Sequence, residues 1–251
     1  MSDNNPFETP VSSKEFNGYW IPKHNAKVMK EGIDNNSAPF LPNKKGEIKA
    51  EPIYNASTGY ILPATRLIPV QFAKAKNGYN SNVVVGRNFA EYCSTNIKEN
   101  EKGVFYNYKD ETGEIHSATY YFPEQTENPD AVIEMAKENL KPSFKLENKT
   151  MEITSSEPEA YLSNYIAACK SGMTLSVSKD IANEFKEKVS VILNNELLSK
   201  EEKDKTLPSL SNTLFNADKK ATEICKQLSE YTQPKEQKLN NTFDNDMEIC
   251  F

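Results

Sequence analysis

Histidine and cysteine, the residues that most often carry catalysis or hold transition metals, are scarce in this sequence. The two histidines are His24 and His116, and neither has a second histidine or a cysteine at the spacing of a metal site. The four cysteines are far apart, without metal or redox spacing, and no glycine-rich phosphate loop is present. We therefore expect no enzyme activity, no bound metal and no cofactor.

Basic and aromatic side chains interleave in the middle of the chain instead. Between Arg66 and Lys109 there are seven Lys or Arg and three Glu, and twelve of the 25 aromatic residues lie between Tyr54 and Phe122. Cations pair with phosphates, and flat rings stack on bases of any sequence. The pattern predicts a sequence-tolerant surface for single-stranded DNA or RNA. The expected phosphate contacts are Arg66, Lys74, Lys76, Arg87, Lys98 and Lys102, and the expected stacking rings are Tyr79, Tyr106 and Tyr108.

The end of the sequence suggests a second binding element. Asp244, Asp246 and Glu248 precede Phe251, and no Lys or Arg follows Lys238. We expect residues 233–251 to be a disordered acidic tail that inserts its aromatic end into an apolar pocket of a partner. The partner would be a replication or recombination protein. Alternatively, the tail would compete with nucleic acid for the protein's own basic surface.

The elements that must position these residues form a mixed pattern. Apolar spacing predicts a helix at 62–75, a short strand at 82–86, a short helix at 88–95 and a hairpin of 104–109 with 115–122. Asn128 and Pro129 start another helix that runs to about Leu140. Residues 19–22 suit an edge strand, and 31–51 a long loop.

The second half of the sequence becomes helical after a short strand at 151–153. Apolar stripes predict one helix around 157–170 and another that starts after Ser178. We expect an α+β fold with a small, mostly antiparallel sheet, followed by a helical region. The expected divisions are a flexible N-terminus at 1–14, a nucleic-acid-binding domain at 15–154, a helical region at 155–232 and the tail at 233–251.

The last predicted helix carries a coiled-coil-like seam at steps of four and three. Its members are Leu210, Leu214, Ala217, Ala221, Ile224, Leu228 and Tyr231. We expect this seam to pack on helices of its own chain. The alternative is a homodimer joined through the seam.

The bulk charge limits the class of function. The net charge is −6, and residues 126–251 account for all of it. An acidic chain argues against a histone-like coat on nucleic acid. No segment resembles a signal peptide or a membrane span, so we expect a cytoplasmic protein without a membrane partner.

A family resemblance rests on short motifs in residues 52–125. They are Pro52, Asn55, Thr58 and Gly59 at a turn, Gly78, Tyr79 and Ser81 after a helix, Lys98, Glu101, Lys102 and Gly103 before a strand, and Phe122, Glu124 and Gln125 at its close. This stretch is similar to the N-terminal, single-stranded DNA-binding domain of ArdC-type antirestriction proteins. Residues 161–168 resemble a helix of that family more loosely.

Two departures from the family pattern accompany this resemblance. The usual tryptophan before the middle helix is absent, and Val83–Val85 stand there. The zinc-metallopeptidase domain that commonly follows is missing, with helices in its place. The resemblance therefore implies DNA binding and no protease. The acidic tip resembles the C-terminal ends of bacterial and phage single-stranded DNA-binding proteins, although it has fewer acids and no proline before Phe251.

The main prediction is a non-catalytic single-stranded DNA-binding protein of a phage, plasmid or conjugative element, active in DNA replication or recombination. Two other functions stay open. One is an antirestriction or anti-defence inhibitor that contacts an enzyme, because DNA mimicry uses acidic surface. The other is a structural oligomer held together by its helices.

Overall fold

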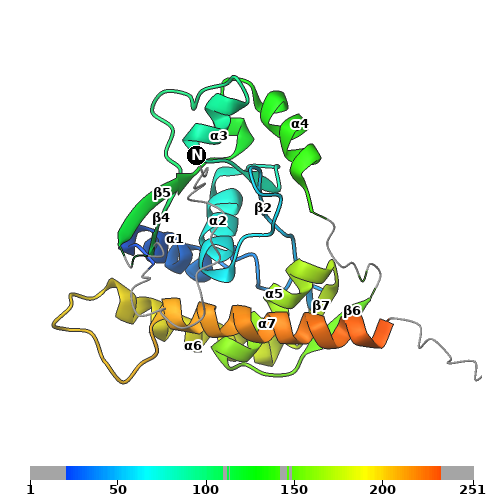
Figure 1. Ribbon diagram of the computed structural model, residues 1–251. Coiled ribbons are helices and arrows are strands. Elements are labelled where there is room, and N and C mark those ends of the chain that lie inside the picture. Colours follow the sequence, from blue (N-terminus) through cyan, green and yellow to red (C-terminus); the bar gives the residue numbers. More distant parts are fainter. Residues whose placement is uncertain (1–20, 110–111, 113, 142–145, 147–148, 233–251) are drawn as a thin grey trace, which may run out of the picture.

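The computed structural model describes residues 21–109, 112, 114–141, 146 and 149–232 (Figure 1). Its helices are α1 (Lys23–Asp34), α2 (Ala64–Asn77), α3 (Arg87–Tyr92), α4 (Pro129–Asn139), α5 (Pro158–Ser171), α6 (Lys179–Leu197) and α7 (Leu210–Thr232), with a 3-10 turn, η1, at Pro123–Gln125. Its strands are β1 (Glu47–Lys49), β2 (Tyr54–Asn55), β3 (Val83–Val84), β4 (Val104–Lys109), β5 (Ile115–Tyr120), β6 (Thr150–Ile153) and β7 (Thr174–Val177). The expected α+β class is confirmed.

The strands form three small sheets among the described residues. In the first, β7 lies between β1 and β6, antiparallel to β1 and parallel to β6. The second pairs β2 with β3 in parallel, and the third is the predicted β4–β5 hairpin. Because β6 pairs with β7, hydrogen bonds cross the division that the sequence suggested at residue 154.

The main core lies between the helices of the lower part of the molecule in Figure 1. Phe40 is at its centre, with ring centroids 5.4 Å from Phe72, 5.9 Å from Tyr165 and 5.5 Å from Phe185, all in edge-to-face geometry. Tyr161 stacks on Phe185, and its hydroxyl donates a 2.9 Å hydrogen bond to the Phe40 carbonyl. These contacts join α2, α5 and α6 around one aromatic cluster.

The seam of α7 packs against its own chain. Leu210, Leu214, Ala217 and Ala221 are fully buried, and α7 lies along α5 (Figure 1). The alanines let the two helix backbones approach closely. The described part of the seam is therefore covered by helices of the same chain. Homodimerisation through the seam stays a prediction.

A smaller lobe sits above this core. α3 and α4 lie side by side at the top of Figure 1, and Ala90, Cys93, Val132 and Ala136 form a second apolar cluster between them. In α4, Asn128 caps the N-terminus by accepting a hydrogen bond from Ala131, as its sequence position predicted. Among the described residues, no helix combines the length and apolar content needed to cross a membrane.

The prediction of a long loop at 31–51 needs correction. Its first residues belong to α1 (Lys23–Asp34) and its last part contains β1 (Glu47–Lys49), whereas the expected edge strand at 19–22 lies partly outside the described residues. Ala26, Met29 and Ile33 have helical spacing and are buried. A Cβ atom on Gly32 would lie 2.4 Å from the Phe72 ring, so glycine permits close contact between α1 and α2. The short strand β7 was not predicted.

Candidate nucleic-acid interface

Arg66 is half-buried and lines a pocket together with Tyr106 and Tyr120. Its guanidinium stands 4.6 Å from the centre of the Tyr106 ring, and Nη1 donates a 3.3 Å hydrogen bond to the Tyr120 hydroxyl. Tyr106 is 6% exposed and stacks on Tyr120 at 4.6 Å. Burial raises the pKa of Tyr106, so its hydroxyl stays neutral. The protein therefore covers the Tyr106 ring, and the stacking of this ring on a base stays a prediction that would require Arg66 or Tyr120 to move.

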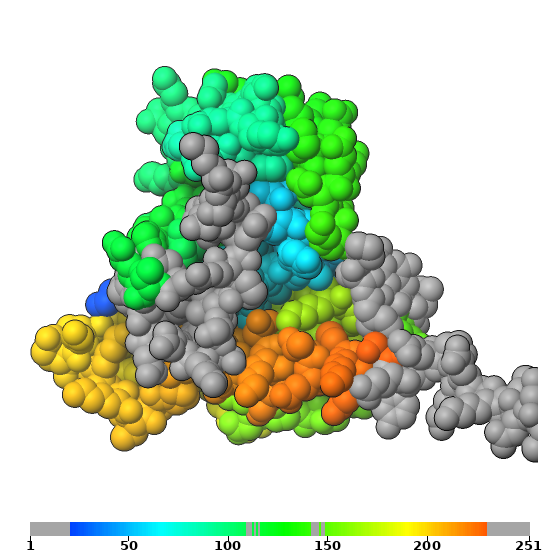
Figure 2. All heavy atoms as spheres, viewed as in Figure 1, coloured from blue at the N-terminus to red at the C-terminus, as the bar shows by residue number. Residues whose placement is uncertain are grey.

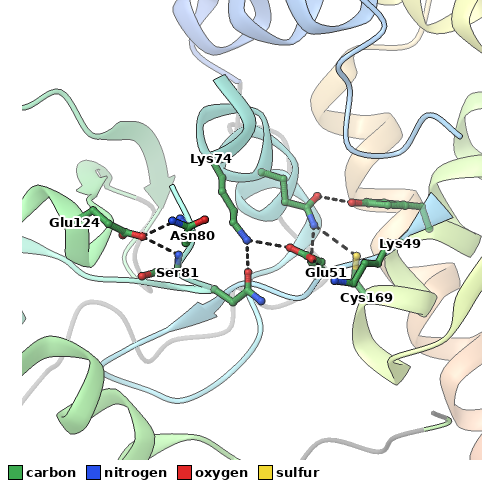
Figure 3. A network of polar contacts seen from close by, with 10 residues as sticks. Lys49, Glu51, Lys74, Asn80, Ser81, Glu124 and Cys169 are labelled. Atoms are coloured by element: carbon green, nitrogen blue, oxygen red, sulfur yellow. Dashed lines mark hydrogen bonds and ion pairs between the residues drawn. The ribbon is translucent and has the colours of Figure 1, made fainter. Parts of the chain in front are cut away.

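Two lysines of α2 are held by carboxylates. Lys74 Nζ lies 2.9 Å from a Glu51 oxygen and also contacts the Asn82 side-chain oxygen, and the lysine side chain is 15% exposed (Figure 3). Lys76 Nζ lies 2.9 Å from Glu31 Oε2. Both charges are met within the fold, so neither lysine offers a free cation to a phosphate.

Glu51 is the centre of a larger polar network (Figure 3). Its second oxygen pairs with Lys49 at 3.0 Å, and its backbone carbonyl accepts a 2.6 Å hydrogen bond from Gln71. Gln71 accepts a 3.0 Å bond from the buried Tyr165 hydroxyl. Burial raises the pKa of Glu51, but the ion pairs with Lys74 and Lys49 outweigh it, so the pKa is below its ordinary value. The network joins α2 to α5.

Glu124 fastens three segments of the small lobe together. Its Oε1 accepts hydrogen bonds of 2.9 and 2.8 Å from the backbone of Asn80 and Ser81 (Figure 3), and its carbonyl accepts one of 2.9 Å from Lys98 Nζ. Burial raises the pKa of this carboxyl, but the backbone donors outweigh it, so the pKa is lowered. Lys98 therefore has a structural contact, although its side chain is exposed.

Tyr79 and Tyr108 are both half-buried. Tyr79 packs on Phe122 at 4.7 Å, and burial, with the nearby charges of Glu101 and Glu124, raises its pKa. Tyr108 stacks on a ring of the opposite strand, His116, at 5.4 Å. Both side chains are thus partly exposed. The tail residues Asp244, Asp246, Glu248 and Phe251 lie outside the described residues.

Two of the predicted cations in the small lobe, Arg87 and Lys102, are exposed. No hydrogen bond or ion pair joins either side chain to another described residue. The sequence also contained a pair of rings that we did not single out for binding. Tyr92 is 70% exposed and stacks on Phe89 at 5.7 Å. Their spacing of three in a short helix was the available signal.

The predicted site residues are thus divided among separate places. Arg66 packs on Tyr106 of the β4–β5 hairpin, Lys74 and Lys76 of α2 pair with glutamates, and Arg87, Lys98 and Lys102 belong to the small lobe. Figure 2 shows the small lobe as the upper end of the molecule, in teal and green. The structure therefore does not bring all of these cations and rings together in one place, and their contact with nucleic acid stays a prediction.

Comparison with known proteins identifies a structural neighbour. No protein-family model and no curated protein sequence matches the chain. The crystal structure of the Mn(II)-bound antirestriction ArdC protein from the R388 plasmid aligns with a TM-score of 0.50 and 10% identity, covering 83% of this chain and 96% of that one. The two chains share a fold. A metal-free structure of the same protein aligns at a TM-score of 0.33 over 69% of this chain and 65% of that chain, too low to carry an argument.

This match is wider than the resemblance found in the sequence. Residues 52–125 carried the sequence motifs, whereas the shared fold extends over nearly all of the neighbour's chain. The neighbour holds Mn(II), but no group of three or more His, Cys, Asp or Glu among the residues described in this chain is placed to hold a metal ion. The described residues do not fit that ion.

Proposed function

We propose that this protein is an antirestriction or anti-defence inhibitor of plasmid type that contacts a defence enzyme of the host cell. The observation that carries the proposal is the fold, which is shared with a plasmid antirestriction protein over 96% of that protein's chain. The inhibitor acts by stoichiometric binding, without chemistry of its own.

The placement of the cations supports contact with a protein over a coat on DNA. Lys74 and Lys76 are neutralised by glutamates, and Arg66 is packed over an aromatic ring. Phosphate binding would have to break these contacts, and the chain's net charge of −6 opposes the approach of a polyanion. An enzyme with a basic DNA-binding surface is attracted by the same charge.

A plating assay tests the proposal. Unmodified phage is plated on a restricting host and on an isogenic host without the restriction system, each with and without the expressed protein. We expect higher plating efficiency on the restricting host and no change on the other. In a cleavage assay with purified endonuclease, inhibition should be complete near one inhibitor per enzyme. No protection on the restricting host would overturn the proposal.

A second candidate function is binding of single-stranded DNA, which the exposed residues of the small lobe favour. Arg87 and Lys102 lie close in sequence to residues that contact Tyr121: Val85 exchanges two backbone hydrogen bonds with Tyr121, and a Cβ atom on Gly103 would lie 3.0 Å from its ring. Cations next to rings are the components of a stacking platform. Recruitment of a replication or recombination protein by the tail belongs to this candidate.

Titration with labelled oligo-dT at low and moderate salt separates the two candidates. Binding by the small lobe predicts a dissociation constant that rises steeply with salt, since each phosphate contact releases counterions. The variant Arg87→Ala with Lys102→Ala should weaken it, and Lys74→Ala with Lys76→Ala should not. Absence of binding at low salt would remove this candidate and leave the antirestriction proposal intact.

A further inference from the structure

We propose that a pocket between α1, α2, the β4–β5 hairpin and α7 binds the carboxylate group of a small organic acid. Each of these elements contributes to the lining, with Asn25 from α1, Arg66 from α2, Tyr106 from the hairpin and Ser211 from α7. A ligand in the pocket would therefore contact segments that lie far apart in the sequence. Such a site would act whether or not the protein inhibits a restriction enzyme.

The lining of this pocket carries a positive charge. Among the described residues that form it, Arg66 is the one Lys or Arg, and none is Asp or Glu. The Arg66 guanidinium is held 4.6 Å from the centre of the Tyr106 ring, and the Tyr106 hydroxyl stays neutral because burial raises its pKa. The described lining therefore attracts an anionic group and brings no negative charge against it.

Several hydrogen-bond donors of the lining have no acceptor in the described part of the chain. Ser211 is 4% exposed, and its Oγ accepts a 2.9 Å hydrogen bond from the Ile21 backbone, but no described group accepts the hydroxyl proton. The same holds for the Thr65 hydroxyl and for the side-chain nitrogen of Asn107, whose oxygen accepts from Ser117. A buried donor without an acceptor is costly. A ligand that brings acceptor oxygens into the pocket would remove this cost.

The size of the pocket favours a carboxylate over a phosphate. Its volume is about 20 Å³, which holds about one or two water-sized groups. The two oxygens of a carboxylate suit this volume, whereas the four oxygens of a phosphate exceed it. A planar guanidinium also matches a carboxylate with two parallel N–H donors. Because a guanidinium has five N–H donors, the ligand would share Arg66 with its existing contacts.

The rest of the ligand should be apolar. Phe105 and Pro22 line the pocket and are partly exposed, Phe105 by 41%, so they border its opening. An apolar or aromatic body attached to the carboxylate would pack on these side chains and bury surface that water now contacts. An acid of the type of benzoate combines the two parts.

Titration of the isotope-labelled full chain with sodium benzoate, followed by two-dimensional NMR, tests the site. Sodium chloride at the same ionic strength is the reference. We expect saturable shifts of the amide signals of Thr65, Asn107 and Ser211 with benzoate, and no saturable shifts of these signals with inorganic phosphate. Absence of saturable shifts with benzoate would overturn the proposal, and so would binding of phosphate with equal affinity.

Charge-matched variants show whether Arg66 holds the ligand. Arg66→Gln should raise the dissociation constant of benzoate at least about tenfold, and Arg66→Lys, which keeps the charge without the planar fork, should lie between it and the wild type. The control Arg87→Gln removes an exposed arginine outside the lining, and it should stay within about twofold. Unchanged affinity of a folded Arg66→Gln protein would overturn the proposal. If that variant does not fold, Ser211→Ala replaces it, and an unchanged affinity has the same meaning.

A last variant distinguishes a free acid from an acid of the chain itself. Asp244→Asn, Asp246→Asn, Glu248→Gln removes the carboxylates of the acidic segment near the end of the sequence, which lies outside the described residues. Affinity for benzoate equal to that of the wild type would support a free acid as the ligand. Tighter binding would show that this segment competes for the pocket, which would overturn the assignment to a free acid.

Discussion

The hydrogen bond between Gln71 and Tyr165 gives the sharpest test of how α2 and α5 are held together. Tyr165 is fully buried, and its hydroxyl donates to Gln71 Oε1 at 3.0 Å. Tyr165→Phe leaves that amide oxygen buried without its partner, which costs about 1–3 kcal/mol. For a chain of this size, each kcal/mol lowers the melting temperature by about 2–4 °C.

The double variant makes this prediction specific to the pair. Gln71→Leu alone leaves the Tyr165 hydroxyl and the Glu51 carbonyl without a partner, and it should cost at least as much as Tyr165→Phe. Once one partner is absent, removing the other leaves fewer additional polar groups without a hydrogen bond. The combined loss in free energy of unfolding should therefore fall short of the sum of the single losses by about 1 kcal/mol or more.

Urea and thermal unfolding followed by far-UV circular dichroism measure these losses. Tyr60→Phe is the control, because Tyr60 is 64% exposed, and its effect should stay within about 0.5 kcal/mol. A Tyr165→Phe protein as stable as the control, or single effects that add without coupling, would refute the assignment of this hydrogen bond.

Three further predictions follow from burial, charge and backbone geometry. The Glu51 carboxyl has a pKa below its ordinary value of 4.5, so its contribution to stability is present above that pH and is lost as pH falls through the lowered pKa. The urea midpoint of a Glu51→Gln protein should therefore decline less on acidification than that of the wild type. Parallel profiles of midpoint against pH would contradict this. Leu214→Ala should cost about 2–5 kcal/mol in thermal unfolding without changing the mass on size exclusion, whereas a halved mass would mean that the seam joins two chains. Gly59 and Gly78 both have positive φ (73° and 70°), but a Cβ atom at Gly59 would lie 1.8 Å from a carbonyl oxygen of α4, whereas nothing lies within 4 Å at Gly78. Gly59→Ala should therefore lower the melting temperature more than Gly78→Ala. Equal melting temperatures would count against this contact.

Local patterns in the sequence were sufficient for most of the helices and for the hairpin. Spacing of apolar residues located α2 and α5, and Asn128 with Pro129 located the start of α4. Alternation along β4 correctly placed Val104 and Tyr106 on one face. These features depend on residues close in sequence, and so a local rule captures them.

The candidate site was less predictable because its properties depend on distant residues. Alternation divides the residues of β4 between two faces, but it does not show which face α2 covers, and so Tyr106 was expected at the surface. The charge of Lys74 is neutralised by Glu51, and nothing near either residue in the sequence indicates that pairing.

The position of β7 between β1 and β6 affects how the chain folds during translation. Ile48 of β1 and Met151 of β6 both pair with Leu175 of β7. Both strands are therefore translated before the strand with which they pair. Until that strand emerges, the nascent chain exposes apolar side chains that belong inside, and a product released before β7 lacks the element that joins its two halves. Premature termination should therefore yield insoluble fragments or clients of chaperones, with no smaller working version of the protein.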